Sequence, residues 1–144
     1  MALSQHDLHQ IRAFNRDYTE LLGLLNKRVF NTTLSWPEAR VLMLIAAQMP
    51  ISPKDVAARL ALDRSYTSRL IKKLATMGLV KKTPSSTDSR AVILTVTTAG
   101  RVLNTQLDQQ SDKQVQQILQ PLTPSQQQRA TQAIETLQDL LFKS

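Results

Sequence analysis

Residues 52–77 read SPKDVAARLALDRSYTSRLIKKLATM, and this stretch decides the fold. Ser52 followed by Pro53 is an N-cap with proline in the first helical position, and Asp63 opens a second helix. Apolar spacings of three and four predict that the second helix buries a stripe formed by Tyr66, Leu70, Ile71, Leu74 and Met77. Two helices joined by a turn of about two or three residues have the spacing of a helix-turn-helix.

The second helix of this motif also carries a polar face. Ser65, Ser68, Arg69, Lys72 and Thr76 fall on one side of a helix, away from the apolar stripe. Hydroxyls and lysines suit phosphates, and an arginine can form a bidentate pair with guanine. An ordinary solvated face is the alternative interpretation. We predict contacts to nucleic acid from Arg64, Ser65, Ser68, Arg69, Lys72 and Lys73.

A pair of β-like segments follows the motif directly. Leu79-Val80 and Val92–Val96 are rich in β-formers and flank the polar stretch KKTPSSTDSR. They predict a hairpin over about residues 79–96 with a long loop. A helix-turn-helix followed by such a hairpin is a winged helix, in which the second helix enters the major groove and the wing reaches the minor groove.

The loop of the predicted wing contains Asp88 two residues before Arg90. The negative potential of a minor groove attracts arginine, and Asp88 can hold the guanidinium of Arg90 in a bidentate pair. A surface pair of little energetic value is the alternative. We also predict phosphate contacts from Lys81 and Lys82 at the base of the wing and from Ser85 and Ser86 in its loop.

The net charge of +7 is concentrated in this part of the chain. Residues 51–101 hold ten basic and three acidic side chains, whereas the two flanks together hold eight of each. An evenly basic surface would not place its charge in this way. The distribution therefore favours a localised site for a polyanion.

Helical periodicity extends on both sides of the motif. A long helix is expected over 4–30, another from the capping box at Ser35 to about Gln48, and two more over 98–120 and 124–142. The expected fold is mainly helical with a small β-hairpin, as one domain with a winged helix-turn-helix lobe over 35–97. The first helix is apolar on more than one face, which suits burial against a partner; its apolar residues include Leu21, Leu22, Leu24, Leu25, Val29 and Phe30.

Several of these segments resemble the MarR family of bacterial transcriptional regulators. The similar segments are SYTSRLIKKL at 65–74, MGLV at 77–80, Asp88-Ser89-Arg90 and VTTAG at 96–100. Ser68 stands where the family usually has threonine, and Val96 where it usually has leucine. The resemblance implies a regulator that binds double-stranded DNA as a homodimer, with 4–30 and 98–142 as dimerisation helices.

The resemblance also implies release from a pseudo-palindromic operator by a small lipophilic or phenolic ligand. Such a dimer would act as a repressor. Tyr18 and Trp36 are the candidate ligand contacts. Plain core packing is the alternative interpretation of both aromatic rings, since aromatics at helical spacing are usually part of a core.

Other functional classes find little support in the sequence. The chain contains no cysteine, which excludes thiol catalysis and disulfides. His6 and His9 lack further metal ligands nearby, and no phosphate-binding loop or catalytic motif occurs, so we expect no metal, no cofactor and no enzyme. We expect a cytoplasmic protein without a membrane span. A winged-helix module that binds protein instead of DNA remains the alternative function.

Overall fold

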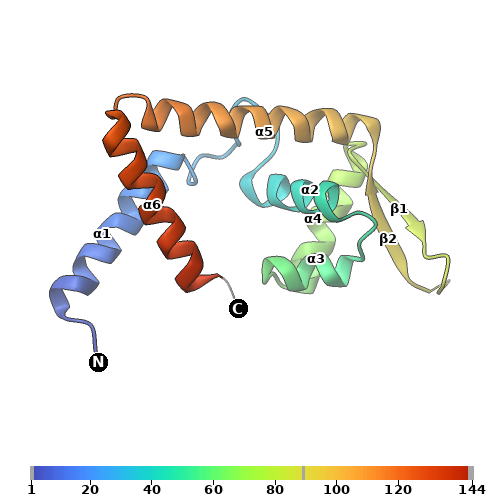
Figure 1. Ribbon diagram of the computed structural model, residues 1–144. Coiled ribbons are helices and arrows are strands. Elements are labelled where there is room, and N and C mark those ends of the chain that lie inside the picture. The colour runs from blue at the N-terminus through green and yellow to red at the C-terminus, as the bar shows by residue number, and fades with distance from the viewer. Residues whose placement is uncertain (1, 89, 143–144) are drawn as a thin grey trace. The chain divides into compact units, whose positions relative to one another are not determined.

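The computed structural model describes residues 2–88 and 90–142, and Ser89 of the loop motif lies outside this description. The described chain forms two compact units that divide between Asp108 and Gln109, and this boundary falls inside one helix. Its elements, labelled in Figure 1, are α1 (Gln5–Leu22), α2 (Trp36–Gln48), α3 (Pro53–Leu60), α4 (Arg64–Thr76), β1 (Val80–Pro84), β2 (Val92–Val96), α5 (Thr98–Leu119) and α6 (Pro124–Leu141).

The helix-turn-helix is confirmed as α3 and α4. The Ser52 hydroxyl accepts the Asp55 N–H at 3.1 Å, and the Asp63 carboxylate accepts the Tyr66 N–H at 3.0 Å, so both helices begin at the predicted caps. Ala61 ends α3 in the left-handed region with φ 52°. This reversal turns the chain within three residues and places α4 against α2 and α3.

The core of the first unit lies between α2, α3, α4 and the hairpin, and α5 adds Leu107 to it. Helix α4 buries Thr67, Leu70, Ile71 and Leu74, a stripe at helical spacing. The predicted stripe was wrong at Met77, which is 37% exposed, whereas Tyr66 is half-buried and packs against the core. Thr67 can be buried at little cost because its hydroxyl donates a hydrogen bond to the Asp63 carbonyl at 2.8 Å.

The hairpin forms with a longer first strand than predicted. Strands β1 and β2 are antiparallel, with Val80 opposite Val96 and Pro84 opposite Val92. Thr83 and Pro84 therefore belong to the strand and not to the loop; Pro84 is tolerated there because it occupies the strand end. Ile51 joins the hairpin through a bond from the Leu94 N–H to its carbonyl at 2.8 Å, which ties the α2–α3 connection to the wing.

The predicted first helix over 4–30 was too long. Helix α1 ends at Leu22, where Gly23 adopts φ 69° and donates its N–H to the Glu20 carbonyl at 3.0 Å. A glycine in the left-handed region is a regular helix terminus, whereas the sequence prediction treated it as an interior residue. Val29 does not extend an apolar helix face but is 1% exposed in the core of the lobe.

Helices α1 and α6, each taken by itself, bury none of their residues. Both begin with a capping box, Ser4 with Asp7 and Thr123 with Gln126. Each nevertheless carries large apolar side chains that are at least 38% exposed, namely Leu8, Ile11, Phe14, Tyr18 and Leu21 on α1 and Ile134, Leu137, Leu140 and Leu141 on α6. Each of these helices therefore has apolar surface that its own compact unit leaves uncovered.

Candidate nucleic-acid interface

The polar face of α4 has the composition that the sequence predicted. Its exposed residues include Arg64, Ser65, Ser68, Arg69, Lys72 and Lys73. The capped first turn and the buried stripe on the opposite side hold this face outward. At helical spacing Ser65, Ser68, Arg69 and Lys72 form one continuous surface. This surface offers hydroxyls and cations on one rigid element.

The guanidinium of Arg69 lies over the ring of Tyr66, with 5.7 Å between the guanidinium carbon and the ring centroid. This is a cation–π contact between residues three positions apart on one helix. Tyr66 was predicted only as a core residue, although an aromatic ring and an arginine at i and i+3 of a helix are a readable signal of this contact. Tyr66 thus restricts the rotamers of the Arg69 side chain.

Lys73 has a partner that the sequence did not indicate. Its Nζ lies 2.7 Å from the Glu38 carboxylate, and the two side chains are 57% and 2% exposed. Burial raises the pKa of the Glu38 carboxyl, but hydrogen bonds from Lys73 and Ser35 and the charge of Lys73 outweigh burial and hold this pKa below its ordinary value. Glu38 is therefore a carboxylate at neutral pH, and it connects the first turn of α2 to α4.

The two lysines at the base of the wing do not form one surface. Lys81 lies opposite Thr95, and Lys82 lies opposite Leu94. Both are exposed, but successive residues of a strand point to opposite faces of the sheet. A duplex lying against one face of the wing would meet only one of the two.

The tip of the wing differs from the sequence prediction in how it holds Arg90. The Asp88 carboxylate accepts the backbone N–H of Arg90 at 3.0 Å, and the Asp88 carbonyl accepts the Ala91 N–H at 3.0 Å. The predicted carboxylate–guanidinium pair is thus replaced by a side chain-to-backbone turn, which aspartate forms readily because its carboxylate reaches the N–H two residues on.

The two serines of the loop also differ from each other. Ser85 is half-buried, and its hydroxyl accepts the Thr87 N–H at 3.3 Å and lies 3.0 Å from the Thr87 hydroxyl. Ser86 is exposed. Ser85 therefore helps to build the turn, while Ser86 is accessible from solvent.

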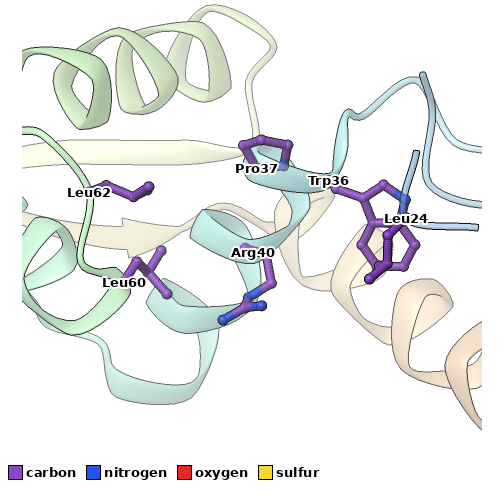
Figure 2. A pocket seen from close by; sticks show the side chains of 6 residues that line it. All are labelled: Leu24, Trp36, Pro37, Arg40, Leu60 and Leu62. Atoms are coloured by element: carbon purple, nitrogen blue, oxygen red, sulfur yellow. The ribbon is translucent and has the colours of Figure 1, made fainter. Parts of the chain in front are cut away.

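A separate cavity of about 300 Å³ lies beside the start of α2. Its lining residues, drawn in Figure 2, are Leu24, Trp36, Pro37, Arg40, Leu60 and Leu62. The Trp36 indole N–H donates to the Gly23 carbonyl at 3.0 Å, and its ring lies 6.0 Å from that of Phe30. The cavity thus has mostly apolar walls and one cation, Arg40.

The structure separates the two aromatic residues that were predicted as ligand contacts. Trp36 lines the cavity beside α2. Tyr18 is not among the lining residues; it is 39% exposed on α1 and stacks on Phe14 at 5.2 Å between ring centroids. Of the two predicted ligand contacts, Trp36 lines this cavity and Tyr18 does not.

Within the described residues, no three histidine, aspartate or glutamate side chains gather in a way that would hold a metal ion. Over residues 2–88 and 90–142, no helix is long and apolar enough to cross a membrane.

Comparison with known proteins identifies the family. A family profile described as MarR family matches residues 32–91, which include α2, α3, α4 and β1. Over 102 residues the chain is 30% identical to the HTH-type transcriptional regulator MgrA of Staphylococcus aureus, covering 71% of this chain and 65% of MgrA. The chain matches the MarR family of winged helix-turn-helix regulators over residues 32–91. It spans about 65% of the length of this MarR relative.

Solved structures with the MarR fold extend the likeness over nearly the whole chain. The regulator PcaV from Streptomyces coelicolor, crystallised in complex with its natural ligand, is 25% identical and aligns with a TM-score of 0.63 over 96% of this chain and 98% of PcaV. FabT from Streptococcus pneumoniae, crystallised in complex with DNA, is 18% identical and aligns with a TM-score of 0.70 over 95% of each chain. The winged-helix fold is thereby confirmed.

Proposed function

We propose that this protein is a dimeric transcriptional regulator that binds double-stranded DNA through α4 and the wing. The observation that carries the proposal is the outward face of α4, where exposed Ser65, Ser68, Arg69 and Lys72 combine hydroxyls and cations on one rigid helix. A helix of this width fits the major groove, and its side chains suit both base edges and phosphates.

Charge and fold support the same conclusion. The net charge of +7 is that of residues 51–101 alone, which include α3, α4 and the wing. FabT, a protein of the same fold, was crystallised with DNA. Arg90 at the wing is exposed and would meet the minor groove next to the site of α4. A protein-binding module would tolerate acidic or apolar residues at both places.

The uncovered apolar faces of α1 and α6 support a homodimer. Phe14 and Leu21 on α1 and Leu137 and Leu140 on α6 are between 48% and 74% exposed. Apolar surface of this kind marks an interface, and a two-fold axis lets identical helices cover each other. A symmetric dimer would also present two copies of α4 to the two halves of a pseudo-palindrome.

The cavity beside α2 supports control by a small ligand, with the protein acting as a repressor that the ligand releases. Its volume of about 300 Å³ lies at the lower end of the range for small-molecule sites. The apolar walls would hold a lipophilic or aromatic body, and Trp36 would stack on it. PcaV, a relative of the same fold, was crystallised with its natural ligand.

The decisive experiment is a titration of labelled duplex DNA with the purified protein at two salt concentrations. Sites selected from a random pool should contain two half-sites about one helical turn, or ~34–36 Å, apart. Affinity should fall steeply between 50 and 200 mM salt, on the order of a thousandfold for a protein with six or more phosphate contacts. Affinity that scarcely changes with salt, or selection of no sequence, would favour the protein-binding module instead.

The assembly is tested separately by sedimentation at micromolar protein. A single species of twice the 16.2 kDa chain mass is expected. A monomer at that concentration would contradict the dimer, while leaving the DNA titration to decide whether the lobe binds nucleic acid.

A further inference from the structure

Lys73 lies on α4 among the residues predicted to contact DNA, yet its amine is turned to the protein. The Lys73 Nζ lies 2.7 Å from the Glu38 carboxylate, and Glu38 is 2% exposed. The same carboxylate accepts the backbone N–H of Ser35 at 2.7 Å, and the Ser35 hydroxyl accepts the Glu38 N–H at 3.3 Å. The amine is therefore bound to the capping box of α2.

We infer that Lys73 is a positioning residue and not a phosphate contact: its ion pair with Glu38 fixes the DNA-facing helix α4 to the first turn of α2. The part of this inference that concerns DNA contact rests on the proposed DNA-binding function. The ion pair itself stands on the structure alone.

The two partners are not equivalent, because only one of them is buried. Without Lys73, the Glu38 carboxylate would remain as a charge enclosed by protein with one partner removed, which is a costly arrangement. Without Glu38, the Lys73 amine could turn to solvent, since more than half of its side chain is already exposed. Loss of the lysine should therefore disturb the contact between α2 and α4 more than loss of the carboxylate charge.

Lys72, the preceding residue, provides a matched control. It is exposed on the DNA-facing side of α4, carries the same side chain, and belongs to the same helical turn. The distinction between the two lysines is that the amine of Lys73 pairs with a buried carboxylate. Removing the Lys73 amine should therefore change the stability of the fold, whereas removing the Lys72 amine should change the salt dependence of DNA binding.

Thermal unfolding at one fixed protein concentration tests the ion pair without any DNA. Lys73→Met should lower Tm by roughly 4–8 °C, because it leaves the Glu38 charge buried and unpaired. Glu38→Gln should lower Tm less, and the double variant Lys73→Met/Glu38→Gln should recover most of the loss. Lys72→Met should leave Tm nearly unchanged. If Lys73→Met has the Tm of the wild type, or if the double variant is no better than Lys73→Met, the inferred attachment is wrong.

The dependence of DNA affinity on salt tests the positioning role. Removing one phosphate contact reduces the slope of log affinity against log salt by about 0.9. Lys72→Met should reduce the slope by about 0.9 for each protomer whose Lys72 contacts a phosphate. Lys73→Met should weaken binding about tenfold, as expected for a displaced base contact, with its slope unchanged. Adding Glu38→Gln to Lys73→Met should restore most of the affinity.

The outcomes separate the two proposals. A slope that falls equally in Lys73→Met and Lys72→Met, with no rescue by Glu38→Gln, would make Lys73 a direct phosphate contact and overturn the inference. Wild-type protein without salt-dependent binding would overturn the proposed function. In that event hydrogen exchange of the α4 amides, faster in Lys73→Met and restored in the double variant, would still decide whether the pair fixes the helix.

Discussion

Helix α4 and the wing each present an arginine, but they hold it at different points of the residue. On α4 the guanidinium of Arg69 itself is held, 5.7 Å from the centroid of the Tyr66 ring. At the wing only the backbone of Arg90 is held, through its N–H on the Asp88 carboxylate at 3.0 Å. The described residues offer the Arg90 guanidinium no carboxylate partner of the kind that the sequence predicted.

This difference suits two different ways of binding DNA. A base edge in the major groove accepts an arginine in one bidentate geometry, so a guanidinium with restricted rotamers loses less entropy on binding. The narrow minor groove attracts arginine through its electrostatic potential, which demands no single geometry. Arg90, with its backbone fixed and its long side chain free to adjust, suits this electrostatic attraction to the minor groove. The comparison predicts that α4 determines sequence preference and that the wing mainly adds affinity.

The largest effect is expected from Arg69→Ala. If Arg69 reads a base, its loss should cost about 1–3 kcal/mol of binding and relax the preference at one base position of each half-site. Lys72→Ala is the control: it should weaken all duplexes alike. Affinities for the preferred duplex and for its single-base variants measure both. Equal losses on every duplex for both variants would mean that α4 contacts only the phosphate backbone.

A smaller effect is expected from Tyr66→Leu. Removing the ring leaves Arg69 without its cation–π contact, and binding to the preferred duplex should weaken by about 0.5–1 kcal/mol. Tyr66→Phe keeps the ring and should bind like the wild type, while Tm measurements report any loss of packing. If the leucine variant binds more tightly, the ring holds Arg69 away from the DNA. If both variants bind equally weakly, the tyrosine hydroxyl contacts the duplex.

The local elements of this protein were readable from sequence because short-range rules determine them. The caps at Ser35, Ser52 and Asp63 begin their helices where predicted, since a side-chain oxygen needs only the N–H two or three residues on. The helix-turn-helix, the hairpin and the exposed face of α4 followed from such rules. The error at Gly23 was also local: a glycine in the left-handed region ends a helix, whereas a glycine inside one only weakens it.

Long-range contacts could not be read in the same way. Glu38 and Lys73 are 35 positions apart, and nothing in either segment indicates that the carboxylate of one capping box meets the amine of another helix. The cavity beside Trp36 likewise depends on Leu60 and Leu62 from the helix-turn-helix. The predicted pair between the Asp88 carboxylate and the Arg90 guanidinium was wrong for another reason. A carboxylate two residues from an arginine can bind either the guanidinium or the backbone N–H, and both fit the same spacing.

The smallest effect is expected at Asp88, where two contributions oppose each other. Asp88→Asn keeps an oxygen that can accept the Arg90 N–H and removes a negative charge beside the phosphates, so binding should tighten by a few tenths of a kcal/mol. Asp88→Ala removes the same charge together with the turn that fixes the backbone of Arg90. Ordering that backbone on the duplex would then cost about 1 kcal/mol, which exceeds the gain from the charge. Binding should therefore weaken.

The comparison between these two variants separates charge from geometry, because they lose the same charge and differ in the backbone turn. Titration of one duplex with wild type, Asp88→Asn and Asp88→Ala measures the order of affinities, which should be asparagine, then aspartate, then alanine. If alanine and asparagine bind equally well, the turn at Asp88 contributes nothing and the wing acts through charge alone. If both weaken binding, the carboxylate must contact the Arg90 guanidinium on the DNA after all, and the contrast between α4 and the wing fails.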